Sequence, residues 1–408
     1  MDKYICIEDI VHTISDTHSF DAKKLHAINT SDVLEGEILA APLMNVSELK
    51  GQFKKTIKKG DLLFSEIRPA NRRYARVDIE DTKDYVVSTK LMVLRKYNDD
   101  VDFDYFYYCI TNQWFLNILQ KRAENRICSF PQITFDLLKE YKFRIPKLSE
   151  QRKIAQILTS LDQKIALNTR MNAELEAMAK QLYDYWFVQF DFPDENGKPY
   201  KSSGGKMVWN EKLKREIPEG WEVKNLFHIA KFTNGIACQN YRPTDDNKLP
   251  VIKIKEMHDG FGSDTEYTTI NIPESIKVYN KDVLFSWSAS LEVMLWSLGE
   301  GALNQHIFKV TSNNGYPKSF YYYQLLEYVD VFKKIAEARK TTMGHITQDH
   351  LEQSAIVVPP DLRLPNLLEK KLSPIMDKMV KLNEEKTYLT HLRDSLLPML
   401  MNGQVTIE

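Results

Sequence analysis

The chain has 408 residues, of which 43% are hydrophobic and 27% are charged, so it is too long for one ordinary core and we expect two to three globular domains. The absence of a long apolar run, of a signal-peptide pattern and of paired cysteines argues against a membrane, secreted or zinc-finger protein and predicts a cytoplasmic one. A net charge of −1 argues against binding nucleic acid through a basic surface alone, so any DNA affinity must come from local patches or from partner subunits.

Residues 1–145 are predicted to form a mixed α/β domain, with a strand at Tyr85–Val87 and a core aromatic run at Tyr105–Tyr108. This domain holds the densest basic cluster of the chain, on a predicted loop. Its members are Arg68, Arg72, Arg73, Tyr74 and Arg76. Arginine can bond guanine bidentately and an aromatic ring can pack on sugar or base, so we predict DNA contact; a solvated loop with ordinary charges is the alternative.

A long amphipathic helix is predicted over residues 146–190, where seam residues recur at alternating spacings of four and three. This 3.5-residue period is typical of a coiled coil. The predicted seam, which also serves as a partner interface, includes Leu158, Leu161, Ile165, Asn168, Leu175 and Leu182. Asn168 and Asn172 cost stability at seam positions but can fix the register; exposure where the seam frays is the alternative.

Residues 191–360 are predicted to form a turn-rich connector, Asp191–Trp221, and a second mixed α/β domain with a strand at Ile307–Val310. Lys255 is a candidate DNA contact, although ordinary loop chemistry is favoured there. Asn304, Gln305 and His306 are polar residues in a strand-like stretch. Asn and Gln can read adenine, but we interpret these three as structural.

Residues 361–408 repeat the seam spacing and are predicted to form a second long helix. Its seam includes Leu372, Ile375, Met379, Leu389 and Leu396. Pairing of the two long helices would bury both apolar stripes at once. Separate packing of each helix on its own domain is the alternative.

Several segments of the first half recur in the same order in the second half. The recurring pairs are Lys59–Ser65 with Asn280–Ser286, Tyr105–Tyr108 with Phe320–Tyr323, and Ile133-Thr134 with Ile346-Thr347. Basic and polar residues precede the last pair at matching places, which favours a shared DNA-facing loop; cations favoured at helix C-termini are the alternative. These candidates are Arg122, Arg126, Arg339, Lys340, Thr341 and Thr342.

Two stretches carry a family resemblance. The run EQRKIAQILTSLDQKIALNTRMNAELEAMAKQLYDYWF from Glu150, with its continuation to Trp221, resembles the central region of type I restriction–modification specificity subunits. GDLLFSEIRP from Gly60, GALNQHIFKV from Gly301 and KTTMGHIT from Lys340 resemble segments of the same family's recognition domains. The resemblance covers nearly the whole chain and is weakest over residues 1–60.

This resemblance implies an α+β fold, with two mixed α/β target-recognition domains separated by two long helices that form an antiparallel coiled coil. It implies sequence-specific reading of a bipartite double-stranded DNA target. Methylation (M) subunits carrying S-adenosylmethionine are implied to dock on the helices, and a motor–nuclease (R) subunit to join for cleavage. The chain itself is then expected to hold no cofactor, no metal and no catalytic residue.

The sequence also lacks the motifs of an enzyme. Val358–Asp361 does not match the Asn/Asp-Pro-Pro-aromatic motif of amino-methylating enzymes, and no GxxxxGK[ST] run exists for a motor. His345 and His350 do not form an HExxH pair, and Glu384–Lys386 falls on the second helix, where charges usually form a solvated face. Two alternatives stay open: a subunit of a methylation-only or other multisubunit restriction–modification assembly, and a coiled-coil scaffold that binds no DNA.

Overall fold

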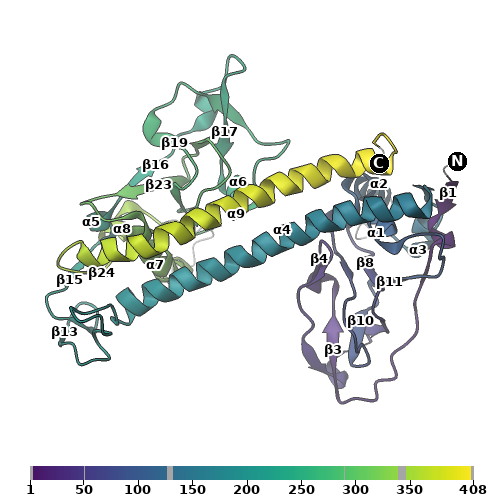
Figure 1. The fold of residues 1–408 in the computed structure, drawn as a ribbon, viewed down its shortest axis with the longest axis horizontal. Helices are drawn as coiled ribbons and strands as arrows, with labels where there is room; N and C mark the ends of the chain where they lie inside the picture. Colours follow the sequence, from purple (N-terminus) through teal and green to yellow (C-terminus); the bar gives the residue numbers. More distant parts are fainter. Residues whose placement is uncertain (1–2, 50, 126–131, 289, 339–345, 406–408) are drawn as a thin grey trace. The chain divides into compact units, whose positions relative to one another are not determined.

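The computed structural model describes residues 3–49, 51–125, 132–288, 290–338 and 346–405. The chain divides into two compact units: unit 1 comprises Met1–Gln163 and Thr390–Glu408, and unit 2 comprises Lys164–Leu389. Each unit contains a globular part and a segment of both long helices, α4 (Leu148–Tyr183) and α9 (Arg363–Met401) (Figure 1). This division does not coincide with the domain boundaries predicted after residues 145, 190 and 360. Those boundaries stay predictions about the target-recognition domains.

Unit 1 is mixed α+β, as predicted, and its helices are α1 (Phe103–Thr111), α2 (Gln113–Glu124) and α3 (Phe135–Leu138). Its strands are β1 (Lys3–Cys6), β2 (Val11–Thr13), β3 (Lys24–Ile28), β4 (Val33–Leu34), β5 (Glu37–Ile38), β6 (Leu43–Asn45), β7 (Phe53–Lys55), β8 (Leu62–Ser65), β9 (Tyr74–Arg76), β10 (Tyr85–Ser88), β11 (Leu91–Lys96) and β12 (Lys142–Ile145). One sheet has the order β2-β11-β8-β9 and is antiparallel throughout. Another has the order β6-β3-β10-β7, in which β3 and β10 are parallel, and β1 pairs with β12.

Unit 2 repeats this topology and adds the hairpin β13–β14. Its strands are β13 (Met207–Asn210), β14 (Arg215–Pro218), β15 (Glu222–Lys224), β16 (Ala230–Asn234), β17 (Lys248–Ile252), β18 (Tyr267–Thr269), β19 (Lys277–Val278), β20 (Val283–Ser286), β21 (Glu292–Leu295), β22 (Gly301–Leu303), β23 (Ile307–Ser312) and β24 (Ile356–Val358). Its helices are α5 (Leu226–Ile229), α6 (Ile254–Asp259), α7 (Lys318–Ala338) and α8 (Gln348–Glu352). The sheet orders are β16-β23-β20-β21 and β18-β17-β22-β19, β17 and β22 are parallel, and β15 pairs with β24. The repeat expected from the sequence is therefore a repeat of structure.

A carboxylate directly before β8 recurs directly before β20. Asp61 is only 1% exposed; it accepts hydrogen bonds from a backbone N–H at 2.7 Å and from the Arg95 guanidinium at 2.8 and 2.7 Å. Asp282 likewise accepts a backbone N–H at 2.8 Å and pairs with Lys309 at 2.8 Å. These bonds fix the turns that lead into β8 and β20, which explains why the two sequence segments resemble each other.

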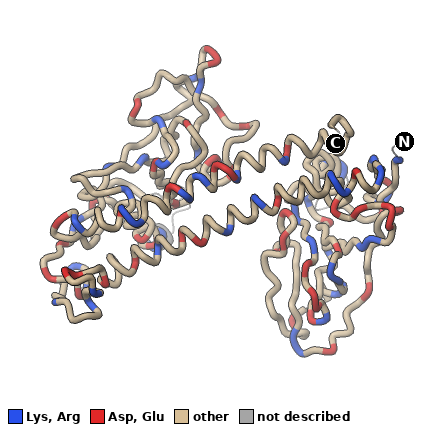
Figure 2. The backbone as a smooth tube through the Cα atoms, viewed as in Figure 1, with Lys and Arg blue, Asp and Glu red and all other residues tan. Residues whose placement is uncertain are grey.

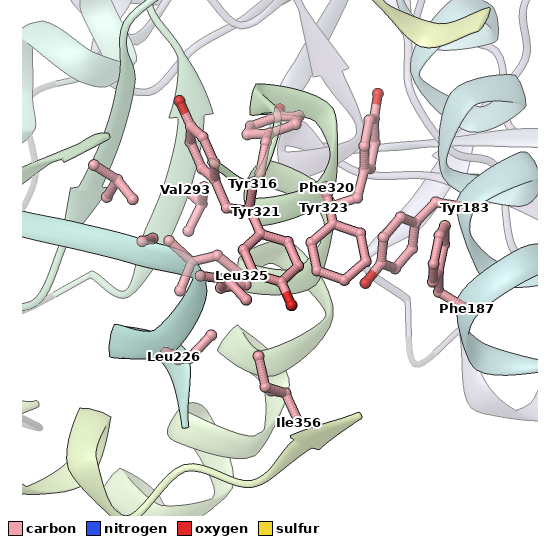
Figure 3. Close-up of a cluster of buried hydrophobic side chains, with 14 of the residues drawn as sticks. Tyr183, Phe187, Leu226, Val293, Tyr316, Phe320, Tyr321, Tyr323, Leu325 and Ile356 are labelled. Atoms are coloured by element: carbon pink, nitrogen blue, oxygen red, sulfur yellow. The ribbon is translucent and has the colours of Figure 1, made fainter. Parts of the chain in front are cut away.

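The aromatic runs lie in the core, as predicted. Figure 3 shows the cluster in unit 2, where residues at the end of α4 face α7. Tyr183 stacks on Tyr323 with ring centroids 5.8 Å apart, and Phe187 meets Phe320 edge-on at 4.9 Å. Because burying one large apolar side chain contributes about 1.5–3 kcal/mol, these contacts anchor the end of α4 to unit 2.

In unit 1, a chain of polar contacts ties α4 to α9. Asp162 of α4 accepts a hydrogen bond from Arg393 of α9 at 2.9 Å and another from the Tyr108 hydroxyl of α1 at 2.6 Å. Burial and the adjacent carboxylate raise the pKa of Tyr108 above its ordinary value, so this hydroxyl stays protonated and donates. The three side chains join both long helices to the core of unit 1.

In unit 2, asparagines make the corresponding contacts. Asn168 donates to Glu385 at 2.8 Å, and Asn172 donates to Asn383 at 2.8 Å. Residue numbers rise along α4 as they fall along α9, so the helices run antiparallel there. The Asn168 hydrogen bond, with Lys164 nearby, holds the pKa of Glu385 below its ordinary value. The predicted asparagine positions are therefore polar pairs between helices and not frayed ends.

The predicted seam residues lie on the buried faces of both helices. Leu158, Asn168, Leu372 and Met379 are buried, and the remaining predicted seam residues are half-buried. Each helix both packs on a globular core and pairs with the other helix. Leu158 joins the core of unit 1 and Leu372 joins the core of unit 2. The polar contacts pair the two helices within each unit. The use of these residues as a partner interface stays a prediction.

The segment predicted as a connector, Asp191–Trp221, packs against the core of unit 2, and its role as a connector stays a prediction. Phe192 stacks on Tyr200 at 4.7 Å and on Trp221 at 5.0 Å, and β13 pairs with β14. Its Gly, Pro and Ser residues form turns between large aromatic side chains, and burial of those side chains holds the segment against the core.

We expect Asp61→Ala to lower the free energy of unfolding by about 1.5–3 kcal/mol, because it removes charge-assisted hydrogen bonds from a buried site. Urea denaturation followed by tryptophan fluorescence measures the change. The control is Asp78→Ala, whose side chain is 86% exposed and contacts Lys59 at 3.3 Å, and which should cost at most about 1 kcal/mol. Equal shifts for the two variants would contradict a structural role for Asp61.

Candidate nucleic-acid interface

The predicted arginine cluster lies on the loop between β8 and β9, which includes a 3-10 turn at Pro69–Asn71. Arg68 and Arg72 flank this turn with left-handed φ values of 46° and 53°. Such values are uncommon for residues other than glycine and persist where the surroundings impose them. Backbone hydrogen bonds from Asn71 to Arg68 at 2.8 Å and from Arg72 to Pro69 at 3.0 Å hold this turn. The loop is therefore a shaped element of unit 1.

Arg72, Arg73 and Arg76 contact their own unit. Arg72 pairs with Glu35 at 2.9 Å, and Arg73 donates to the backbone carbonyls of Ser31 and Val33 at 3.0 and 3.2 Å. Arg76 bonds to Asp104, and its guanidinium carbon lies 3.9 Å from the ring centre of Tyr107. Arg68 is exposed. These contacts position the loop, and DNA contact by the four arginines stays a prediction.

Tyr74, which was predicted to contact DNA, is a buried residue. It is 8% exposed, and its ring lies between Phe64 at 6.2 Å and Tyr107 at 6.1 Å. The side chain points inward because β9 is covered on both faces: Tyr74 joins one buried cluster and its neighbour Ala75 joins another. Because other rings cover it, the Tyr74 ring is not accessible for stacking on a DNA base.

The structure describes two of the other predicted DNA-contact residues. Arg122 lies in the last turn of α2 above the Tyr141 ring, 5.0 Å from its centre, and Lys255 lies on α6 in an ion pair with Asp264. The remaining predicted residues, Arg126, Arg339, Lys340, Thr341 and Thr342, lie outside the described residues. Ile133-Thr134 and Ile346-Thr347 do lead into equivalent helices, α3 and α8.

A cavity of about 310 Å³ lies in unit 1 beside this loop. Its walls include Arg72, Tyr107 and the Asp162–Arg393 pair, and Trp114 on its rim is 68% exposed. Among the residues that the structure describes, no group of three or more His, Cys, Asp or Glu side chains lies close enough to hold a metal ion. None of the described helices combines the length and hydropathy required to span a membrane.

One junction of three segments was not identified as a site from the sequence. In unit 1, the N–H of Glu66, just after β8, donates to the carbonyl of Lys90 at 3.0 Å. The carbonyl of Glu66 accepts from the N–H of Ile133 at 2.7 Å. The junction thus joins the loop after β8, the turn between β10 and β11, and the segment before α3. Lys90 is exposed and Glu66 is half-buried.

The same three-segment junction exists in unit 2. The N–H of Trp287, just after β20, donates to the carbonyl of His306 at 3.3 Å, and the carbonyl of Trp287 accepts from the N–H of Ile346 at 3.0 Å. His306 is exposed and Gln305 is half-buried. Gln305 and His306 therefore lie on a surface turn and not within a strand as expected, and their structural role stays a prediction. The repeated Leu-Phe-Ser ends of β8 and β20 mark this place in the sequence.

Charged residues of both signs alternate over both units (Figure 2). This pattern agrees with the net charge of −1. Any contact with DNA would therefore depend on particular loops and not on a basic surface.

Comparisons with known proteins agree with the repeat. A family model described as the type I restriction modification DNA specificity domain matches residues 3–177 and 218–387. The specificity subunit of the type I restriction enzyme HindI from Haemophilus influenzae is 29% identical, with 99% of each chain covered. The MjaIX specificity subunit from Methanocaldococcus jannaschii is 28% identical over 76% of this chain and 71% of its own. The S subunit of a type I restriction–modification system from M. genitalium has a similar fold, with a TM-score of 0.57, 14% identity and coverage of 98% and 96%.

We expect Arg76→Ala to lower the free energy of unfolding by about 1–2 kcal/mol, because it removes an ion pair and a cation–π contact from a half-buried site. The midpoint of urea denaturation measures this loss. Lys153→Ala, at an exposed position of α4, is the control and should stay within about 0.5 kcal/mol of the parent protein. An unchanged midpoint for Arg76→Ala would show that this arginine does not stabilise unit 1.

Proposed function

Since the chain belongs to the type I restriction–modification DNA specificity family, we propose that its two units each read one half of a bipartite double-stranded DNA target. The observation that carries this proposal is the repeated scaffold: both units have the same strand orders, the same parallel strand pair and the same three-segment junction. Two copies of one scaffold suit a target with two half-sites.

The charge of the chain supports a shared complex with DNA. Phosphate contacts supply much of the affinity of a DNA-binding protein, and they require a local excess of Lys and Arg. This chain has 55 basic and 56 acidic residues. In the proposed assembly, the chain selects the sequence while partner subunits add phosphate contacts.

The proposed partners are methylation subunits and a motor–nuclease subunit. Exposed apolar side chains on the long helices, Met178 at 59% and Tyr388 at 67% exposure, suit contacts with a methylation subunit. That subunit would bind S-adenosylmethionine, and this chain would bind no cofactor and catalyse no reaction. We therefore assign it the role of a recognition subunit.

Purified alone, the chain should transfer no methyl group and cut no DNA. Incubation with target-containing DNA and labelled S-adenosylmethionine measures the first activity, and gel analysis of supercoiled DNA measures the second. The methylation subunit added to the same preparation is the positive control. Methyl transfer that persists in the chain after removal of all partners would contradict a non-catalytic role.

Replacing residues 1–145 by the corresponding part of a relative should change one half-site and leave the other unchanged, because this region supplies the globular part of unit 1. Genome-wide mapping of methylated sites in a host that carries the exchanged protein measures both half-sites. The matched exchange of residues 222–358 should change only the other half-site. Alteration of both half-sites by either exchange would show that the units do not read DNA independently.

A further inference from the structure

We propose that the three-segment junction is the base-reading face of each unit, with Glu66 and Lys90 reading a C·G pair and Gln305 and His306 reading an A·T pair. This inference rests on the proposed function and specifies which side chains choose the bases. It differs from the arginine-cluster prediction, because the loop arginines whose contacts are described above bond largely to their own unit.

The first argument is that the junction keeps its backbone and changes its side chains. Glu66 corresponds to Trp287, and Lys90 corresponds to His306, because each pair makes the same N–H to carbonyl hydrogen bond. The serine before each also repeats a contact: Ser65 Oγ donates to a carbonyl two residues on at 3.2 Å, and Ser286 Oγ does so at 3.3 Å. Two modules that recognise different sequences need a constant scaffold beneath variable side chains.

The second argument is the rigidity of the junction in unit 2. Trp287 donates its indole N–H to Asn234 Oδ1 at 3.2 Å, and its ring lies 5.7 Å from His306 and 5.9 Å from Phe308. Gly235 allows the adjoining backbone to approach, because a Cβ there would lie 2.2 Å from the carbonyl oxygen of Asn304. The turn that carries Gln305 and His306 is therefore held by its neighbours.

The chemistry of unit 2 favours an A·T pair. The Gln305 amide is half-buried beside His306, with 3.3 Å between the two side-chain nitrogens, and His306 is exposed. An amide can donate to adenine N7 and accept from adenine N6 at the same time. An uncharged amide on a fixed turn thus suits adenine in the major groove.

The chemistry of unit 1 favours a C·G pair. Glu66 accepts a hydrogen bond from the Gln132 amide at 2.7 Å, which orients its carboxylate, and exposed Lys90 is bonded to Glu66 through the backbone. A carboxylate accepts from cytosine N4, while a lysine donates to guanine O6 and N7. A carboxylate and an ammonium group on two segments joined by a backbone hydrogen bond match the cytosine and the guanine of one base pair.

The test uses the complex of this chain with its methylation subunit and a library of DNA with randomised half-sites. Lys90→Ala should reduce discrimination at one position of the first half-site by roughly ten- to a hundredfold and leave the second half-site unchanged. Gln305→Ala should have the converse effect, at one position of the second half-site. Sequencing of the bound DNA measures both preferences in a single experiment.

Two side chains of the same kind serve as controls. Lys96, at the other end of β11, matches Lys90, and Gln353, exposed after α8, matches Gln305; alanine at either should leave both half-sites unchanged. Unchanged selection with Lys90→Ala and Gln305→Ala, while the parent complex selects a bipartite site, would overturn the inference and leave the proposed function standing. A Lys90-dependent position occupied by A·T would overturn the base assignment. A parent complex that selects no bipartite site would overturn the proposed function as well.

Discussion

The structure depends on one constraint: each long helix has an apolar stripe along its whole length, and that stripe must be buried against two kinds of neighbour. At both ends of each helix it packs into the core of a globular part: Leu158 and Leu400 lie in the core of unit 1, and Tyr183 and Leu372 lie in the core of unit 2. Elsewhere it faces the other helix. Apolar contacts alone would tolerate a slide of one helix along the other, because they are not directional. The Asp162–Arg393 bond and the Asn172–Asn383 bond supply the direction and fix which residues lie opposite each other.

The features that the two units share and the side chains in which they differ are separated in space within each unit. Asp61 and Asp282 fix the turns before β8 and β20 from inside, whereas Glu66 and Trp287 follow the same strands at their other ends. A change at the second kind of position leaves the inner carboxylate and its hydrogen bonds in place. This separation allows one scaffold to be used twice in a chain with different side chains on its surface.

Much of the fold could be predicted from the sequence, because strong periodic signals carry it. The 3.5-residue seam, the aromatic runs and the repeated segments all correspond to buried elements, since burial imposes a spacing that can be read along the chain. The packing of residues 191–221 could not be predicted for the opposite reason. The turn residues of this segment dominate the local pattern, while Phe192 and Trp221 find their partners only in three dimensions.

The candidate site was harder to predict. Arginines are conspicuous in a sequence, but contacts such as Arg72 with Glu35 join residues from distant segments that no local pattern reveals. Tyr74 was misplaced because the alternation of a short strand gives few residues to count. The junction at Glu66 and Trp287 is marked in the sequence by a repeated motif followed by a difference. Two matching strands end there on the same Leu-Phe-Ser residues and then diverge.

The make-up of unit 1 has a consequence for how the protein is made. Unit 2 is one continuous stretch, whereas unit 1 combines residues 1–163 with residues from 390 onward. On the ribosome, the N-terminal part of a protein usually folds first. Here unit 1 has to wait for Arg393 and Leu400, which pair with Asp162 and complete its core, while unit 2 already has all of its residues. The first domain to be synthesised is thus the last to be completed, and a chain that stops short of α9's final turns leaves that core open to water.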